Sequence, residues 1–227
     1  MSPRPILPGY QFDRTVARFR DTSRGQFVSR QRIAQLMEQS VNTAEDRLGQ
    51  IIQGVFANEI APANAQLLMR DELRRLTLVN NALGKGGLDR LDFRDYGRAG
   101  RQLRDSYQRM TNLITDIDRG RVSLPQALNR IEGYVLDARR QFFAAGREAA
   151  QQSGAVFEDR RILHARESCI DCVRYAQLGW QPAGTLPLPG ERSRCGSYCH
   201  CSMEQREVTP EMMRERQVAR LERMMAQ

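Results

Sequence analysis

Several residue types are scarce in this 227-residue chain. The first 168 residues contain no cysteine, and the whole chain has one lysine, one tryptophan and two histidines. No run of 18 apolar residues occurs, so the sequence predicts no membrane-spanning helix. Its first residues lack the apolar stretch of a signal peptide, and we therefore expect folding in a reducing cytoplasm. With 41% hydrophobic and 7% aromatic residues, we expect a modest core and much partner-facing surface.

No catalytic constellation is visible either. The two histidines, His164 and His200, are not accompanied in the sequence by the serine or carboxylate residues that nucleophilic catalysis uses. We expect His164 to make a local hydrogen bond. The stretch Gly84-Lys85-Gly86-Gly87 lacks the G-x-x-x-x-G-K-[ST] spacing of a phosphate-binding loop. The sequence therefore predicts a protein that is not an enzyme.

The most informative feature present is a group of five cysteines near the C-terminus. Cys169 and Cys172 form a C-x-x-C pair, and Cys195, Cys199 and Cys201 follow after a loop rich in proline and glycine. Two pairs of thiolates from two tight turns, about twenty residues apart, are typical of a tetrahedral zinc site. Because such a loop cannot form a core alone, the metal would supply its folding free energy. The sequence thus predicts structural Zn²⁺.

Alternatives stay open for these cysteines. Two disulfides with one spare thiol fit the count, although an odd number is awkward for a disulfide framework. Thiols without metal are a second alternative, and a redox role for the C-x-x-C pair would need a βαβ context that is not visible. Within a zinc site the C-x-x-C pair is the most secure. Cys195 with either Cys199 or Cys201 would complete it, with His200 as a less favoured ligand.

Charge and hydrophobic patterning divide the chain into four parts. These are an extended basic and aromatic arm (1–28), a helical domain (29–154), a cysteine-rich metal-binding module (155–208) and a C-terminal amphipathic helix (209–227). The fold class expected is mainly α: an elongated helical bundle, then a small irregular α+β zinc-knuckle module, then the last helix.

Apolar residues at three- and four-residue steps predict four helices in the helical domain. The first follows an N-cap at Ser29, and the second begins at Pro62 and ends near 83. The third covers about 98–119, and the fourth opens at a capping box over 123–126 and ends near 154. A strand over 155–163, with 203–208 as its partner, is expected beside the metal.

Both ends of the chain are expected to contact partners. Residues 1–35 carry seven arginines and two aspartates, a net charge of +5. The aromatic residues Phe12, Phe19 and Phe27 lie among these charges with little apolar surface nearby, so we expect the arm to order only on another surface; the alternative is an arm packed back on its own domain. Leu221 and Met225 lie on one stripe of the C-terminal helix and are the candidates for binding a partner, while core packing of this stripe against the helical bundle is an equally open alternative.

Arginine dominates the basic residues. Lys85 is the only lysine among 35 basic residues, a bias that either a GC-rich genome or the bidentate contacts of arginine to phosphate and carboxylate would explain. Six arginines near the cysteine loop would line a basic stripe, although acidic residues are mixed with them: Arg160, Arg161, Arg166, Arg174, Arg192 and Arg194. A zinc-containing nucleic-acid-binding protein is therefore the alternative function, and any DNA binding should be nonspecific.

The combination of these features resembles phage minor head proteins of the Mu F-like head-morphogenesis family. The resemblance rests on the stretch from Thr22 to Ser29, TSRGQFVS, on the all-helical middle, and on the C-x-x-C pair. A Leu-Pro-Leu-Pro-Gly loop at 186–190 and a final C-x-C at 199–201 complete it. The chain departs from the family at the second knuckle, where His-Pro-x-Cys-Arg-Cys is usual and Cys195-Gly-Ser-Tyr-Cys199-His200-Cys201 stands here.

The resemblance implies a non-enzymatic virion protein that acts near the portal vertex in capsid assembly and genome packaging or delivery. The partners implied are other virion proteins: portal, major capsid or connector proteins. We expect several copies or a homo-oligomer, possible nonspecific contact with packaged DNA, and no membrane partner. The location expected is the virion, after folding in the host bacterial cytoplasm.

Overall fold

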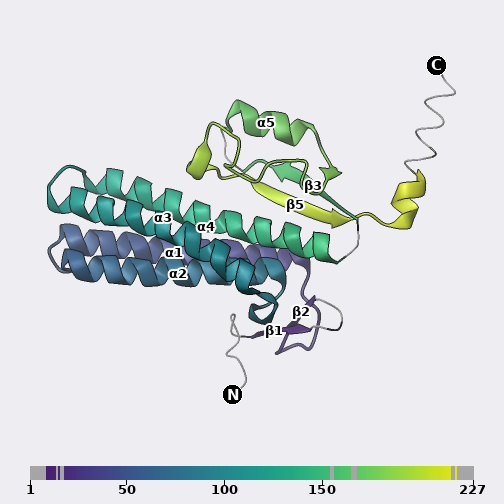
Figure 1. The fold of residues 1–227 in the computed structure, drawn as a ribbon, viewed down its shortest axis with the longest axis horizontal. Coiled ribbons are helices and arrows are strands. Elements are labelled where there is room, and N and C mark those ends of the chain that lie inside the picture. Colours follow the sequence, from purple (N-terminus) through teal and green to yellow (C-terminus); the bar gives the residue numbers. More distant parts are fainter. Residues whose placement is uncertain are drawn as a thin grey trace. The chain divides into compact units, whose positions relative to one another are not determined.

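The computed structural model describes residues 9–13, 15, 18–153, 156–164, 168–215 and 218. As predicted, it is mainly helical with a small sheet (Figure 1), and it has a cysteine cluster near the C-terminus. The chain divides into two compact units, Met1–Gly146 and Arg147–Gln227. Within the described ranges, no helix has the length and apolar character that a membrane span requires.

The first unit contains the predicted helices, and three of them, which begin at Arg30, Pro62 and Leu124, start where the sequence signals place them. In order it holds β1 (Tyr10–Asp13), β2 (Arg18–Asp21), α1 (Arg30–Phe56), α2 (Pro62–Lys85), the 3₁₀ helix η1 (Leu88–Arg90), α3 (Phe93–Asp118) and most of α4 (Leu124–Gln152). The Ser29 hydroxyl accepts a hydrogen bond from the Arg32 N–H at 3.1 Å, which confirms the N-cap of α1. Pro62 opens α2, where its missing N–H costs nothing.

Helix α3 begins at Phe93, earlier than the predicted residue 98. The Asp92 carboxylate accepts the N–H groups of Arg94 and Asp95, and the Asp95 carboxylate accepts the Asp92 N–H at 3.0 Å. This reciprocal capping satisfies donors that the helix itself cannot. The first turn is mostly exposed, so no apolar period marked it in the sequence.

The four long helices bury one continuous apolar core. Its largest fully buried side chains include Met37, Leu48, Ile52, Met69, Leu73, Leu76, Met110, Leu113, Ile114, Ile131 and Val135. Asn80, also fully buried, accepts from the Ser40 hydroxyl at 3.0 Å and donates to the Ala138 carbonyl at 3.1 Å, which joins α1, α2 and α4. At Gly84 the backbones of α2 and α4 come so close that a Cβ added to this glycine would lie 2.3 Å from the Phe142 carbonyl oxygen.

The only lysine of the chain is buried. Lys85 Nζ lies 3.1 Å from Asp95 Oδ2, with 2% and 1% of the two side chains exposed. Arg98 pairs with the other oxygen of the same carboxylate at 2.5 Å. A charge removed from water must be paired to be tolerated, and here the pair ties the end of α2 to the start of α3.

The arm differs from the expectation of a segment without structure of its own. Over its described residues β1 and β2 form an antiparallel hairpin in which Phe12 lies opposite Phe19, with ring centroids 5.1 Å apart. Phe19 is 8% exposed, and the Phe12 ring lies against Gly86, where an added Cβ would come within 2.6 Å of it. The aromatics thus find apolar surface on their own chain. Phe27 remains 38% exposed, with Arg18 and Arg20 over its ring.

The second unit is built on a three-stranded sheet in the order β4-β3-β5. Strand β3 (Phe157–Ile162) pairs antiparallel with β5 (Ser202–Glu207), which confirms the predicted strand pair, and with the short β4 (Gln181–Pro182). Two arginines of this sheet contact the Trp180 ring: the guanidinium carbon of Arg160 lies 4.7 Å from the ring centre and that of Arg206 lies 4.1 Å from it. Helix α5 (Ile170–Gln177) packs against β3 and carries the first cysteine pair.

The boundary between the compact units lies at Gly146, whereas the sequence placed a domain boundary at 154. The last turns of α4 belong with the second unit because Arg147 pairs with Asp159 at 3.0 Å and donates to the Leu186 carbonyl at 2.9 Å. After β5, residues 210–215 are helical. Leu221 and Met225 lie outside the described residues.

Candidate metal centre

Three short elements of the second unit bring the five cysteines together. Cys169 is the N-cap of α5 and Cys172 lies in its first turn. Cys195 and Cys199 flank the 3₁₀ helix η2 (Gly196–Tyr198), and Cys201 directly precedes β5. Because α5 and β5 both pack on β3, the two halves of the cysteine motif meet although 22 residues separate them in the chain.

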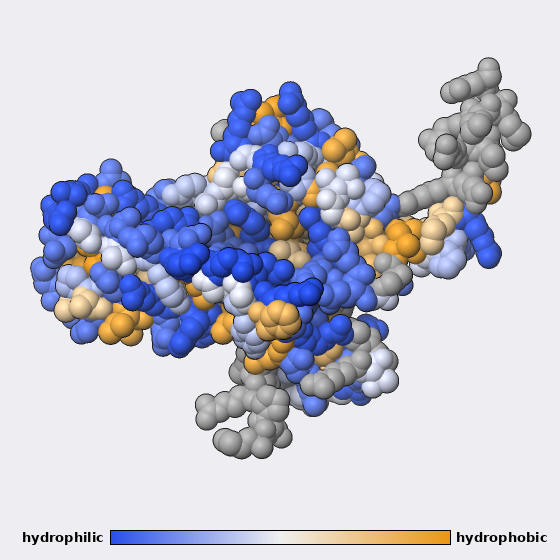
Figure 2. Space-filling view, in the orientation of Figure 1, coloured by the Kyte–Doolittle hydropathy of each residue, from blue (hydrophilic) through white to orange (hydrophobic). Residues whose placement is uncertain are grey.

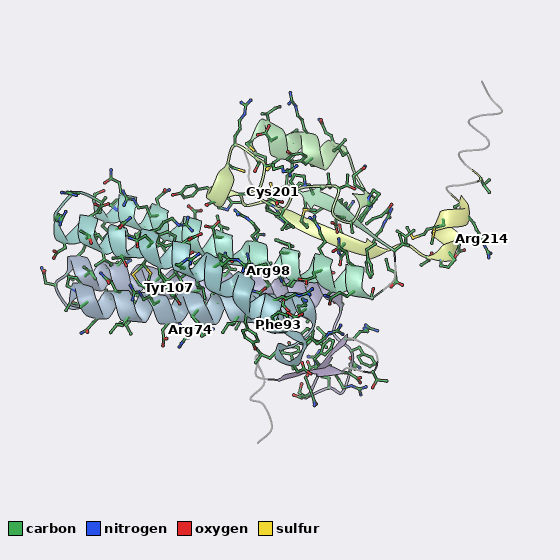
Figure 3. The ribbon with its side chains drawn as sticks, viewed as in Figure 1. Arg74, Phe93, Arg98, Tyr107, Cys201 and Arg214 are labelled. Atoms are coloured by element: carbon green, nitrogen blue, oxygen red, sulfur yellow. The ribbon has the colours of Figure 1, made fainter. Side chains whose placement is uncertain are left out.

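The sulfur atoms form a connected group (Figure 3). The Sγ atoms of Cys169 and Cys195 lie 3.6 Å apart, those of Cys172 and Cys195 3.7 Å, and those of Cys172 and Cys199 3.6 Å. Two overlapping triads result, one of Cys169, Cys172 and Cys195 and one of Cys172, Cys199 and Cys201, each with its sulfurs within 4.8 Å. Cys172, shared by both, is 1% exposed.

These distances fit a metal ion that is bound by thiolates. Zinc–sulfur bonds of about 2.3 Å in a tetrahedron separate neighbouring sulfurs by about 3.8 Å, close to the spacings found. All five cysteines are free thiols, and their sulfur separations exceed the disulfide length of about 2.05 Å, so the alternative of two disulfides is wrong for this structure. The cluster is therefore one that could hold a metal ion.

Local hydrogen bonds favour one thiolate from each half of the motif. Burial acts to raise the pKa of Cys169, but N–H groups of Cys172 and Cys195 donate to its sulfur, and the net effect lowers that pKa. A hydrogen bond from the Cys201 thiol lowers the pKa of Cys199 to about 4, against the effect of burial, and the Cys201 N–H adds to the lowering. A metal ligand must be deprotonated, and the lowered pKa values of Cys169 and Cys199 favour the deprotonated form of these two thiols.

The remaining thiols are held neutral in the metal-free protein. Burial raises the pKa of both Cys172 and Cys195. The thiol that donates to Cys199 is that of Cys201, and this hydrogen bond is the main reason why the pKa of Cys201 is raised. Metal binding at this cluster would therefore release protons, as it does at other thiolate sites.

Groups around the cluster hold its two halves in register. The Asp171 carboxylate accepts the Arg194 N–H at 2.9 Å, and the Tyr175 hydroxyl donates to the Arg192 carbonyl at 2.8 Å. The Ser193 hydroxyl lies 3.2 Å from Cys195 Sγ. Sequence reasoning did not find these supporting residues. The place of Asp171 inside the C-x-x-C turn was the only local signal for any of them.

The histidines do not join the cluster. His164 Nε2 lies 2.6 Å from the Ser202 hydroxyl, which confirms its expected local hydrogen bond. His200 is exposed and belongs to neither triad. The other predicted contact residues lie elsewhere: Phe12 and Phe19 belong to the hairpin of the first unit, and Phe27 follows it.

Part of the predicted basic stripe beside the cysteine loop is taken up by other contacts. Arg160 pairs with Glu204 at 2.5 Å, Arg194 contacts Asp171 at 3.8 Å, and Arg161 is 2% exposed. Arg174 and Arg192 are exposed, and Arg166 lies outside the described residues. The module itself therefore neutralises only some of these charges.

Comparison with known proteins finds no relative of this chain. No protein family, no curated protein and no solved structure matches it. The functional assignment therefore depends on the residues of this chain alone.

Proposed function

We propose that this chain is a non-enzymatic structural protein of a phage virion, a minor head or portal-proximal connector component in which one zinc ion holds the C-terminal module together. The observation that carries the zinc part is the preformed group of five thiols at spacings suited to tetrahedral coordination. The virion part rests on the motif resemblance, together with a mainly helical fold that ends in this module.

The ligands proposed are Cys169, Cys172, Cys195 and Cys199. Their sulfurs form an unbroken series of contacts at 3.6, 3.7 and 3.6 Å. Cys199 and Cys201 both belong to the second triad, and the 3.6 Å contact of Cys199 with Cys172 is the reason for choosing Cys199. In this arrangement Cys201 supports the site, because its N–H and thiol both donate to the Cys199 sulfur. Such donors around a metal orient its ligands and stabilise the thiolate form.

A structural rather than catalytic role suits the burial of the site. Cys172 and Cys199 are 1% and 5% exposed, and four thiolates leave no open position for water or substrate. Zinc, when bound, would cross-link the first turn of α5 to the two ends of η2. The residues themselves provide the thiolates, the N–H donors and the exclusion of water.

The proposed partners are portal, major capsid or connector proteins, with the chain present in several copies in the particle. Candidate contact residues are Phe27, which is 38% exposed, and Leu221 and Met225 of the C-terminal segment. The alternative, a nucleic-acid-binding zinc module, is less well supported because Arg160 and Arg194 pair with acidic groups and Arg161 is buried.

Metal analysis of protein purified without a histidine tag tests the zinc site. We expect one zinc per chain in the unaltered protein and in Cys201→Ser, and less than about a tenth of an equivalent in Cys172→Ser. Full zinc occupancy in Cys172→Ser would contradict the proposed ligand set. Loss of zinc in Cys201→Ser with retention in Cys199→Ser would exchange the roles of these two cysteines.

Purified phage particles test the virion role separately. The chain should be found in intact particles by mass spectrometry, and Leu221→Asp should prevent its incorporation while leaving the helical content of the isolated protein unchanged. Absence of the unaltered chain from mature particles and from their assembly precursors would contradict the virion role without touching the zinc site.

A further inference from the structure

One face of α3 in the first unit carries a row of arginines, most of which have no role in the fold described so far. From Asp92 to Asp105 the chain has four arginines and three aspartates, a net charge of 4 − 3 = +1. Asp95 is 1% exposed and already paired with Lys85 and Arg98, whereas Asp92 and Asp105 are exposed at the two ends of the row. Between those two ends the charge that faces solvent is positive. In Figure 2 a strongly hydrophilic band covers α3 on the face in view.

Three arginines of this face carry no acidic partner in the structure. Arg94, Arg101 and Arg104 are exposed, and among the described residues no carboxylate forms an ion pair with them. Most other arginines of the first unit are paired, for example Arg109 with Asp137 at 2.7 Å and Arg130 with Asp116 at 2.9 Å. An exposed stripe of unpaired arginines along a helix is the electrostatic footprint of a polyanion-binding surface.

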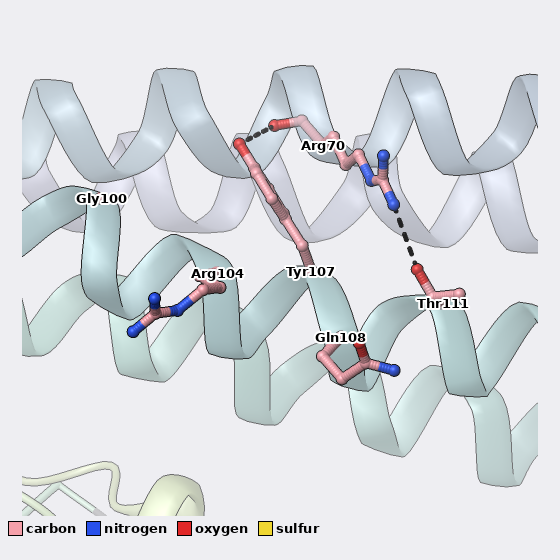
Figure 4. Close-up of a pocket in the computed structure, with 6 residues that line it drawn as sticks. All are labelled: Arg70, Gly100, Arg104, Tyr107, Gln108 and Thr111. Atoms are coloured by element: carbon pink, nitrogen blue, oxygen red, sulfur yellow. Dashed lines mark hydrogen bonds between the residues drawn. The ribbon is translucent and has the colours of Figure 1, made fainter.

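A shallow cavity of about 310 Å³ opens on the same face, between α2 and α3. It is lined by Arg70, Gly100, Arg104, Tyr107, Gln108 and Thr111 (Figure 4). Tyr107 is fixed by a hydrogen bond from its hydroxyl to the Arg70 carbonyl at 3.2 Å, and Arg70 donates to Thr111 at 3.3 Å. The Nε atom of Arg70 is buried and has no hydrogen-bond partner among the described residues.

The placement of the two cavity arginines suits a chain of phosphates better than a single anion. In Figure 4 the guanidinium groups of Arg70 and Arg104 lie on either side of Tyr107, and they do not converge on one point. The Arg70 guanidinium carbon lies 5.6 Å from the centre of the Tyr107 ring. Two cations held apart on neighbouring helices, Arg70 on α2 and Arg104 on α3, match the repeated charges of a phosphodiester backbone.

Two glycines leave backbone without side chains on this face. Gly97 and Gly100 lie inside α3, where each costs about 1 kcal/mol relative to alanine. A Cβ added at Gly100 would meet no atom within 4 Å, so nothing in the chain itself requires glycine there. At Gly97 the nearest atom is Arg101 Nη1, at 3.9 Å. Bare backbone beside unpaired arginines permits close approach by a ligand.

Exposed aromatic side chains lie on the same helix. Phe93 is 79% exposed and Tyr96 48% exposed, one turn before the glycines, and Figure 3 labels Phe93 and Arg98 on this helix. Aromatic rings combined with a basic groove are the means by which proteins hold single strands, since unstacked bases stack on the rings while the arginines follow the backbone. Duplex DNA would use the arginines but would leave these rings without a role.

We infer that the α3 face formed by Phe93, Tyr96, Gly100, Arg101 and Arg104 binds single-stranded nucleic acid without sequence preference. The arginines contact consecutive phosphates, Gly100 lets the backbone lie close to the helix, and the two aromatic rings stack on bases. This inference concerns the first unit only. It depends neither on the zinc module nor on the virion role.

The test is fluorescence anisotropy with a labelled 25-nucleotide oligothymidine and a duplex of the same length, titrated with the full-length protein over a range of salt concentrations. The single strand should bind more tightly than the duplex at every salt concentration. Changing Arg101→Gln and Arg104→Gln together should reduce the slope of log affinity against log salt by roughly 1.4, about 0.7 for each phosphate that is no longer neutralised. Phe93→Ala with Tyr96→Ala should weaken single-strand binding about tenfold or more.

A matched control removes the same charge elsewhere. Arg119→Gln with Arg121→Gln should leave the salt slope unchanged. Both residues are exposed: Arg119 is the C-cap of α3, and Arg121 lies in the loop that follows, 3.9 Å from Asp116. Gly100→Leu should weaken binding without loss of thermal stability, because the added side chain has open space. Equal effects of the two arginine pairs would overturn the inference. So would absent binding at low salt, duplex binding as tight as single-strand binding, or equal binding of polyglutamate.

Discussion

Removing the amino group of Lys85 should be among the costliest single changes in the first unit. Its Nζ lies 3.1 Å from Asp95 Oδ2, and both side chains are almost fully buried. Lys85→Met keeps much of the apolar stem and removes the charge, and breaking a buried pair from one side costs about 3–5 kcal/mol. Because Arg98 and the Asp92 N–H still contact the Asp95 carboxylate, we expect a loss of about 3 kcal/mol, at the lower end.

The reciprocal change should cost more. Asp95→Leu leaves the ammonium group of Lys85 in a dry site without its carboxylate and also removes half of the capping box of α3, which adds about 1 kcal/mol. The double variant Lys85→Met/Asp95→Leu should lose much less than the sum of the two single changes. Replacing both members of a buried pair by apolar groups is often nearly neutral, so the remaining cost should come mainly from the missing cap.

Urea unfolding of the full-length chain at neutral pH, followed by far-UV circular dichroism, measures these free energies. Arg74→Met is the matched control, because Arg74 pairs with Asp71 at 2.7 Å with 61% and 74% of the two side chains exposed. Its loss should change the stability by less than about 0.5 kcal/mol. A Lys85→Met variant as stable as this control would refute the reasoning that burial makes the pair matter.

Three further outcomes are expected from thermal or urea unfolding. Gly84→Ala should destabilise the first unit by several kcal/mol, because its Cβ would lie 2.3 Å from a backbone carbonyl, whereas Gly100→Ala should stabilise it by about 1 kcal/mol. Ser29→Ala should cost about 1 kcal/mol through loss of the α1 cap. A zinc chelator should lower the fluorescence-detected midpoint, since Trp180 is the only tryptophan and lies in the second unit, and should leave the circular-dichroism transition of the first unit in place. Coincident shifts of both signals would contradict this last expectation.

Much of the fold could be predicted from local signals. The starts of α1 and α2 were readable because Ser29 and Pro62 precede regular apolar periods, and β3 with β5 was readable as two short runs on either side of the cysteines. The start of α3 was missed because its first turn buries no apolar face: Phe93 and Tyr96 are exposed to solvent, so no apolar period marks this turn in the sequence.

What the sequence could not supply was long-range pairing. The aromatic rings of the N-terminal hairpin find their apolar surface beside Gly86, about 74 residues further along the chain from Phe12, and no local pattern encodes that contact. The partnership of Lys85 with Asp95 is also invisible, because a lone lysine usually faces solvent. The spacing of the cysteines predicted that these five residues come together, but it did not predict which sulfur atoms lie in contact with one another.

The strand order of the second unit has a consequence for synthesis on the ribosome. Strand β3 is the middle strand of β4-β3-β5, yet it is made first, and its main partner, β5, is completed only at Glu207. Until then β3 presents an unpaired edge of the kind that joins other chains. A transcript truncated between the codons for Cys201 and Glu207 would therefore release a chain with all five cysteines but with an open edge on β3. Such chains should aggregate, although their first unit is complete by Gly146.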